Sequence, residues 1–323
     1  MTLKDLAVLA NVSVSTVSKA FADSSEISEA KRNEIFSLAR KHGCFDKYYK
    51  GKFGKKIVAL ICPEIRSAFY TEFAAKLSDA IDRRGGMMTL SVTNFNREQE
   101  SSLIRYYSSY GHADGVILFN GGGSIKQDPA IPIIAIGSPK SNRFVDRLNT
   151  DLAAGIDEAV EYLKEMGHKK IGFLWEKHTA SKYRYFCESM HKNGLPVTEE
   201  FCVCSDSRFE IAGYHAMETL TKLPEHPTAV IASYDYMAMG AIRYAQEAGI
   251  RIPEDISIIG MDNISTTAYL GVPLTTITTL DDELCETAVD LLFKKMDNHF
   301  YFSKQEITLK SSLIKRESVA KIE

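Results

Sequence analysis

The sequence predicts a small all-α headpiece containing a helix-turn-helix, followed by an α/β core of two lobes, each built on a parallel sheet. Two observations indicate this fold class. The first 45 residues contain three short helical patterns, whereas from Ile57 onward short apolar runs alternate with amphipathic segments. The 323 residues are also enough for two or three domains. We therefore expect a headpiece at 1–45, a linker at 46–56 and a core at 57–323.

The headpiece pattern is a helix, a sharp turn and a second helix. Thr2 is placed to cap the first helix, with Asp5 three residues later as an acidic capping partner. Asn11 stands at the turn, because Asn tolerates left-handed backbone. Residues 14–21 continue as the second helix, and Ser28 is placed to cap a third that runs to about His42. Two helices joined by a tight turn, the second with a polar face, are typical of a unit that binds DNA.

The charge of the chain is unevenly distributed. The net charge is −3, but residues 1–56 hold 11 Lys and Arg against 6 Asp and Glu, a local net charge of +5. A compact basic segment is what phosphate binding requires, and a solvated charged face is the alternative. No apolar run reaches membrane-spanning length, and the first residues have no signal-peptide pattern. These features predict a cytoplasmic protein with no membrane partner.

Apolar runs of strand length recur through the core. Because continuous apolar strands alternate with helices, we expect parallel sheets covered on both faces, with a ligand cleft at the carboxyl ends of the strands. A helix from Asp151 to Gly167 opens the second set of strands. The expected lobes are an N-lobe of about 57–149 plus 281–303 and a C-lobe of about 150–280 plus 304–323. The predicted strands are Ile57–Cys62, Met87–Val92, Gly115–Phe119, Ile131–Ile136, Ile171–Leu174, Phe201–Cys204, Ala229–Ala232 and Ser257–Met261.

The residues that usually carry catalysis or bind metals show no recognisable arrangement. There is no Ser–His–Asp set, nucleophile elbow or P-loop, and Gly121-Gly122-Gly123 lacks the dinucleotide-binding spacing. We therefore expect no enzyme, no metal and no cofactor. Reduced structural thiols are expected at all six cysteines, which lack metal-ligand spacing: Cys44, Cys62, Cys187, Cys202, Cys204 and Cys285.

Motifs along nearly the whole chain resemble those of the LacI/GalR family of transcriptional regulators. The headpiece carries TLKDLA at 2–7, NVS at 11–13 and TVSK at 16–19. The core carries GHKKIG at 167–172, DYMAMGA at 235–241, IPEDISIIGMD at 252–262, PLTTI at 273–277 and RES at 316–318. The resemblance implies a helix-turn-helix headpiece on a periplasmic-binding-protein-like core.

The resemblance also implies a function. Members of this family are usually homodimers that bind near-palindromic double-stranded operators, and most respond to a sugar or another small molecule. We expect a sequence-specific regulator, a repressor controlled by a small-molecule effector, most simply a sugar or sugar derivative. Control by a protein partner, control without any ligand, and a solute-binding protein are the alternatives.

The family match assigns DNA-binding roles to residues at the start of the second helix. Val14 and Ser15 occupy base-reading positions, and Lys19 is a third. Val14 is suited to a thymine methyl group and Lys19 to guanine or phosphate, although a core role for Val14 is an alternative. The remaining predicted DNA-binding residues are Ser13, Thr16 and Ser18, as short donors to phosphate, together with Thr2, Lys47 and Lys50.

The linker departs from the family pattern. Relatives have Pro-Asn after the third helix and then Ala-Arg-x-Leu, a segment that folds into a hinge helix on DNA. Here the stretch is shorter, lacks that motif and contains five Lys, two Gly and three aromatic residues. Tyr48, Tyr49 or Phe53 is a candidate wedge into the minor groove, and a flexible tether is the alternative.

The effector residues are predicted by matching family positions at the strand ends. Phe69 and Tyr70 follow the first core strand, Asn120 ends the strand at 115–119, and Asp262 ends the strand at 257–261. A carboxylate at position 262 accepts two hydroxyl hydrogen bonds, which suits a sugar.

Three positions differ from the sugar-binding pattern of the family. Lys182 replaces the usual Arg and loses its planar fork, Tyr234 replaces an Asn, and Leu152 replaces another. We include Lys182 and Tyr234 in the predicted effector site. Packing roles are the alternative for Phe69 and Tyr234.

Overall fold

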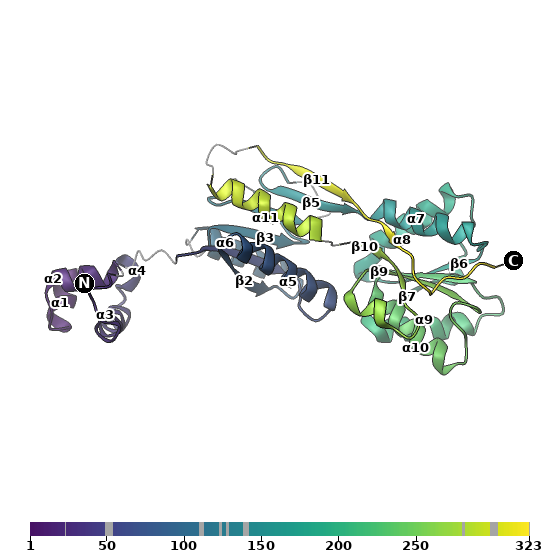
Figure 1. Cartoon of the computed structure of the whole chain (residues 1–323), viewed down its shortest axis with the longest axis horizontal. Coiled ribbons are helices and arrows are strands. Elements are labelled where there is room, and N and C mark those ends of the chain that lie inside the picture. The colour runs from purple at the N-terminus through teal and green to yellow at the C-terminus, as the bar shows by residue number, and fades with distance from the viewer. Residues whose placement is uncertain are drawn as a thin grey trace. The chain divides into compact units, whose positions relative to one another are not determined.

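The computed structural model describes residues 1–22, 24–48, 54–109, 113–122, 125–126, 129–137, 142–279, 282–297 and 303–322. The chain divides into two compact units, Met1–Lys56 and Ile57–Glu323. Figure 1 labels their helices and strands. Among the described residues, no helix has both the length and the apolar character needed to cross a membrane.

The described residues of the headpiece form four helices, α1 (Leu3–Leu9), α2 (Val14–Phe21), α3 (Glu29–Lys41) and α4 (Phe45–Tyr48). The predicted capping box of α1 is confirmed, because the Thr2 hydroxyl accepts from the Asp5 amide and the Asp5 carboxylate accepts from the Thr2 amide. Asn11 has a φ of 49°, as the turn requires. Leu6, Val17 and Ile35 are fully buried and bring α1, α2 and α3 around one core.

Helix α4 corrects the predicted boundary between headpiece and linker. Its Phe45 ring meets Phe36 edge-on at a centroid distance of 5.0 Å, and Tyr48 lies 5.8 Å from Phe21. The Tyr48 hydroxyl also donates to the carbonyl oxygen of Met1 at 2.9 Å. Residues 46–48 therefore belong to the headpiece rather than to the linker, because the Tyr48 ring, together with that of Phe45, completes its small apolar core. Tyr48 is accordingly packed and not a free wedge. Tyr49, Lys50 and Phe53 lie outside the described residues.

In the N-lobe, the described strands form a six-stranded sheet in the order β11-β5-β4-β3-β1-β2. Its parallel pairs are β1–β3, β3–β4, β4–β5 and β5–β11. Helices α5 and α11 share one apolar cluster with one face, and α6 packs on the other. The elements are β1 (Lys56–Cys62), α5 (Ala68–Arg83), β2 (Gly86–Val92), α6 (Arg97–Ser109), β3 (Gly115–Phe119), β4 (Ile133–Ile136), β5 (Asp146–Asp151), α11 (Asp282–Asp297) and β11 (Glu306–Lys310).

Strand β11 corrects the predicted lobe boundary. We expected 304–323 in the C-lobe, but Glu306–Lys310 pairs in parallel with residues 147–151 of the N-lobe sheet. The buried Asp146 carboxylate holds the returning chain in place, since its Oδ1 accepts from the Gln305 amide at 2.8 Å and from Lys295 Nζ at 2.9 Å. The added strand provides hydrogen-bond partners for the backbone groups along the edge of β5.

The C-lobe is a second six-stranded sheet, in the order β12-β10-β9-β8-β6-β7. All of its described pairs are parallel except β10–β12. Helices α7 and α8 cover one face, and α9 and α10 the other. The elements are α7 (Leu152–Glu165), β6 (Ile171–Glu176), η1 (Lys177–Thr179), α8 (Ala180–Lys192), η2 (Glu199–Phe201), β7 (Cys202–Ser205), α9 (Phe209–Thr221), β8 (Ala229–Ala232), α10 (Asp235–Glu247), β9 (Ser257–Asp262), η3 (Ser265–Tyr269), β10 (Thr275–Thr278) and β12 (Leu313–Ile314).

Helices α9 and α10 are in backbone contact at two glycines. A Cβ atom on Gly213 would lie 1.7 Å from the carbonyl oxygen of Met237, and one on Gly240 would lie 1.8 Å from that of Glu210. Neither position leaves room for a methyl group, because the opposing atoms belong to the backbone and cannot rotate away. These glycines fix how closely the two helices approach beneath the strand ends of the C-lobe.

We expect Gly213→Ala to destabilise the core by roughly 1–3 kcal/mol or more, because α9 and α10 must separate to admit the methyl group. The measurement is the thermal unfolding midpoint of the purified chain. Gly271→Ala is the matched control, since no heavy atom lies within 4 Å of its added Cβ. Equal midpoints for the two variants would contradict the packing argument.

Candidate functional site

The first candidate site is the exposed face at the start of α2. The Ser13 hydroxyl caps the helix by accepting from the Thr16 amide at 3.0 Å. Ser15 and Ser18 are exposed, and Val14 retains 40% of its side-chain surface. The core alternative for Val14 is therefore wrong, because Val17 takes the buried position one turn later. The arrangement offers an apolar contact flanked by short hydroxyl donors.

The other predicted DNA-binding residues surround this face in different ways. The amine of Lys19 forms an ion pair with Glu26, so it must leave that carboxylate to reach a base or phosphate. The Thr2 side chain is occupied in capping α1. Lys47 is exposed on α4, with its amine 5.2 Å from the centre of the Tyr48 ring. Lys50 lies outside the described residues.

The second candidate site lies where the two lobes face each other. Tyr70 of the N-lobe is buried, and its hydroxyl is hydrogen-bonded to the Asn120 side chain and feels the charge of Asp262 in the C-lobe. Burial raises the pKa of Tyr70 above its usual range, so the hydroxyl is a neutral hydrogen-bonding group. Asn120 and Asp262 have φ angles of 55° and 112°, uncommon for residues other than glycine. Such backbone strain clusters at functional positions.

Lys182 and Asp262 form the polar centre on the C-lobe side. Their Nζ and Oδ1 atoms are 3.5 Å apart, and Lys182 also donates to the carbonyl oxygen of Ser233 at 2.7 Å. The Thr279 hydroxyl donates to Asp262 at 3.2 Å. Burial raises the pKa of Asp262, while the Lys182 charge and these hydrogen bonds oppose the rise. A ligand hydroxyl arriving here meets both a carboxylate acceptor and an ammonium donor.

Phe69 and Tyr234 are engaged in packing in this structure. The Phe69 ring meets Tyr70 edge-on at 5.0 Å and Phe119 at 5.7 Å, and it remains half-buried. The Tyr234 hydroxyl accepts from the Phe209 amide at 2.9 Å. Burial raises the pKa of Tyr234 to about 12. Both side chains therefore shape the walls of the site and hold neighbouring residues in place.

Asp235 is a structural residue whose role the sequence did not reveal. It is almost fully buried at the start of α10, where its carboxylate accepts from the Ile264 amide at 2.9 Å and from the Thr276 hydroxyl at 2.6 Å. These bonds tie the start of α10 to the loop that follows β9 and to strand β10. Burial, and secondarily the charge of Asp262, raises the pKa of Asp235 to about 8.

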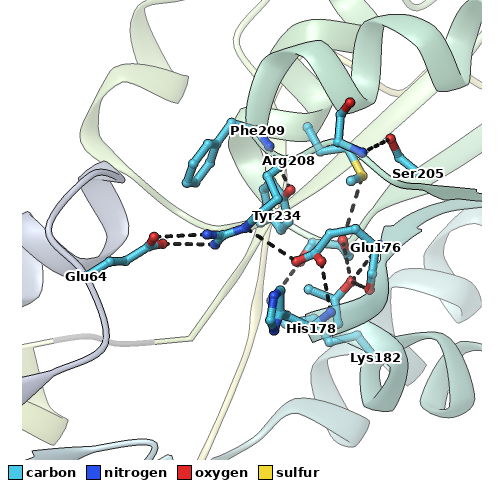
Figure 2. A network of polar contacts seen from close by, with 12 residues as sticks. Glu64, Glu176, His178, Lys182, Ser205, Arg208, Phe209 and Tyr234 are labelled. Carbon is cyan, nitrogen blue, oxygen red and sulfur yellow. Dashed lines mark hydrogen bonds and ion pairs between the residues drawn. The ribbon is translucent and has the colours of Figure 1, made fainter. Parts of the chain in front are cut away.

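Three further charged residues between the lobes were also missed. Arg208, which precedes α9, donates through both terminal nitrogens to the carboxylate of Glu64 in the N-lobe, each at 2.9 Å. Figure 2 shows this guanidinium between Glu64 and Glu176. A signal for the two glutamates exists in the sequence, because Glu176 ends β6 and Glu64 follows β1 by two residues. No sequence signal marks Arg208, since it lies in a short polar turn.

A groove of about 610 Å³ lies beside this cluster, against α9 and α10. It contains none of the six predicted effector residues. Its walls are mostly apolar, which distinguishes it from the polar centre between the lobes. It is lined by Arg208, Phe209, Glu210, Ile211, Tyr214, Met239, Gly240 and Arg243.

Comparison with known proteins finds matches to both units. Residues 2–44 match the family described as bacterial regulatory proteins, lacI family. Residues 160–319 match the periplasmic binding protein-like domain. The first match covers α1 to α3 of the headpiece, and the second covers most of the C-lobe.

Individual relatives extend these matches over nearly the whole chain. The HTH-type transcriptional repressor CytR of Escherichia coli (strain K12) is 31% identical over 316 residues, which cover 91% of this chain and 89% of CytR. The HTH-type transcriptional repressor PurR of Escherichia coli O139:H28 is 29% identical, covering 99% and 97%. A ribose-bound LacI family regulator from Enterococcus faecium superposes with a TM-score of 0.71 at 25% identity, covering 83% and 100%.

The raised pKa of Asp235 predicts a pH-dependent stability. Because its folded pKa of about 8 exceeds the reference value of 3.8, the residue favours folding below pH 4, and that contribution is lost as the pH rises towards 8. We expect Asp235→Asn, which stays neutral, to lose less stability than the parent chain between pH 5 and 8. The two free energies of unfolding should diverge by at most about 1.4 kcal/mol per pH unit. The measurement is urea unfolding of both chains at a series of pH values.

Asp255→Asn is the control for this measurement. Arg251 lowers the pKa of the exposed Asp255 to about 2, so its titration ends well below pH 5. Its stability curve should run parallel to that of the parent chain from pH 5 to 8. If the stability curve of Asp235→Asn also runs parallel to that of the parent chain, Asp235 does not have the raised pKa that burial predicts.

Proposed function

Because this chain belongs to the lacI family of bacterial regulatory proteins, we propose that it is a cytoplasmic repressor that binds a near-palindromic operator as a homodimer and responds to a small-molecule effector. The observation that carries this proposal is the exposed start of α2, with Ser13, Val14 and Ser15 free of the headpiece core. Its relatives CytR and PurR are both transcriptional repressors, which favours repression over other roles and gives no support to an enzyme.

The proposed DNA contacts follow from the geometry of α2. The first residues of a recognition helix reach base edges in the major groove, where the Val14 methyl groups suit thymine and the Ser15 hydroxyl donates or accepts. Ser13, Thr16 and Ser18 provide short donors to phosphate, and Lys19 joins them once released from Glu26. The net charge of +5 over residues 1–56 supports the same placement of DNA.

Exposed apolar side chains support the proposed homodimer. Met87 and Leu90 are exposed on the edge strand β2, and Ile211 is exposed on α9. In Figure 1, β2 and the α9–α10 pair lie along the same lower side of the two-lobed core. A second copy that covers this side would bury apolar surface on both lobes and set two headpieces against two half-sites.

The proposed effector is a small polyhydroxylated molecule held between the lobes. Tyr70, Asn120, Lys182 and Asp262 provide neutral and charged donors and acceptors from both lobes, a combination suited to hydroxyl groups. The ribose-bound relative supports a sugar. A ligand that contacts both lobes favours one of their relative orientations, and that preference changes operator affinity.

We expect Val14→Ala to weaken binding to the preferred operator roughly 5- to 30-fold, because it removes methyl contacts with a base but leaves the headpiece core intact. The operator is first selected from random duplexes with the full chain, and binding is then measured by fluorescence anisotropy. Val8→Ala is the matched control, since Val8 is 80% exposed on α1 of the same headpiece.

Two outcomes would contradict this DNA-binding proposal. Equal operator affinities for Val14→Ala and Val8→Ala would remove Val14 from the base-reading positions. A duplex with one half-site that binds as tightly as the palindrome would argue against the homodimer.

We expect Asp262→Asn to reduce effector affinity at least about tenfold while operator affinity in the absence of effector stays the same. The effector probe is the neutral monosaccharide, starting with ribose, that most raises the unfolding midpoint of the parent chain. Affinity is measured by calorimetry and operator binding by anisotropy. Asp255→Asn, on the surface of the C-lobe, is the control. An undiminished response in Asp262→Asn would show that the effector binds elsewhere.

A further inference from the structure

The contact between Glu64 and Arg208 joins the two lobes through a pair of parallel hydrogen bonds. Both N–H···O distances are 2.9 Å, the geometry in which a guanidinium and a carboxylate bind most specifically. Glu64 follows β1 of the N-lobe, and Arg208 immediately precedes α9 of the C-lobe. The Glu64 side chain is 6% exposed, so solvent screens this ion pair much less than an open surface pair. The pair therefore resists separation of the lobes.

A second carboxylate holds Arg208 in position from the C-lobe side. Glu176 Oε1 lies 4.0 Å from Arg208 Nε, which has no hydrogen-bond partner among the described residues. The Glu176 carboxylate is itself fixed, since its Oε2 accepts from the His178 amide at 2.8 Å. Figure 2 shows the guanidinium extended from this carboxylate towards Glu64. The C-lobe thus presents a pre-oriented cation to the N-lobe.

Aromatic rings from both lobes lie near the guanidinium. Its central carbon is 5.4 Å from the centre of the Phe95 ring and 4.5 Å from that of Phe209. Phe95, in the N-lobe, also stacks on His178 of the C-lobe at 5.0 Å with an interplanar angle of 21°. Both phenylalanines have positive φ angles, 61° and 63°, which are strained for bulky residues. The surrounding contacts keep both rings in these strained positions.

Two backbone amides nearby donate across the same lobe boundary. The Ala68 amide donates to the Tyr236 hydroxyl at 3.4 Å, and the Ser265 amide donates to Glu72 Oε1 at 3.1 Å. Both bonds must break when the lobes separate. Their exchange with solvent therefore reports lobe opening directly, without a ligand or an attached probe.

We propose that Glu64 and Arg208 form a clasp that holds the lobes together without effector, with Glu176 and the rings of Phe95 and Phe209 positioning the guanidinium. This inference rests on the proposed function, in which lobe orientation controls operator binding. The clasp raises the population of the closed core from which an effector between the lobes binds. Glu64 and Arg208 act as positioning residues in this scheme, because they set an equilibrium between lobe orientations.

The test is hydrogen exchange of the full chain, without ligand or DNA, followed at the Ala68 and Ser265 amides by mass spectrometry. We expect Glu64→Gln to accelerate exchange at both amides at least about tenfold, because it removes the negative charge that faces the Arg208 guanidinium across the lobe boundary. Glu286→Gln is the matched control. Glu286 pairs with Arg84 at 2.8 Å within the N-lobe, so the same substitution leaves the lobe boundary untouched.

Arg208 provides a second, independent perturbation in case Glu64→Gln destabilises the fold. Arg208→Gln should accelerate the same two amides, and Arg208→Lys, which keeps the charge but loses the fork, should give an intermediate rate. The double variant Glu64→Gln/Arg208→Gln should be no faster than the faster single variant, because the two residues act through one contact.

The clasp is wrong if exchange at Ala68 and Ser265 in folded Glu64→Gln or Arg208→Gln matches that of Glu286→Gln. This outcome is separate from failure of the proposed function, because neither DNA nor effector enters the measurement. If the parent chain binds no selected operator but exchange is accelerated in Glu64→Gln and Arg208→Gln, the clasp is supported and the proposed repressor function is wrong.

Discussion

Parallel strands bring their carboxyl ends to one edge of a sheet, and in this core the strand-end residues of the two sheets meet each other. Asn120 follows β3 of the N-lobe, whereas Glu176 and Asp262 end β6 and β9 of the C-lobe. Residues more than a hundred positions apart thereby become neighbours. The Tyr70 hydroxyl, for example, feels the charges of Glu64, Arg208 and Asp262 together. The proposed effector site and the contact between the lobes consequently use the same few elements.

This convergence buries several charged side chains, and two of the carboxylates are paired directly with cations. Glu64 is matched by both terminal nitrogens of Arg208, and Asp262 by the amine of Lys182. Burying a carboxylate without a partner is strongly unfavourable. Asp235, near Asp262, is instead stabilised by two hydrogen-bond donors, with a pKa raised to about 8. The same desolvation that strengthens polar contacts with a ligand therefore also makes the fold sensitive to the loss of a single partner.

The stability of the headpiece is limited by its size, since a domain of about fifty residues has little apolar surface to bury. Helix α4 adds Phe45 and Tyr48 to the cluster around Phe21 and Phe36, and Tyr48 also binds the first carbonyl group of the chain. Tyr48, predicted from the sequence to lie in the linker, thus helps to complete the headpiece core.

The sequence by itself determined the local features, because these depend on neighbours a few residues apart. The capping box of Thr2 and Asp5, the left-handed turn at Asn11 and most core strands follow from periodicity and turn chemistry. The family resemblance added the strand-end positions of Asn120 and Asp262. Only the tertiary structure decided that residues 306–310 return to the N-lobe sheet and that α4 packs on the headpiece. It alone paired Arg208 with Glu64, since 144 residues separate them and no local pattern records which buried carboxylate a distant guanidinium meets.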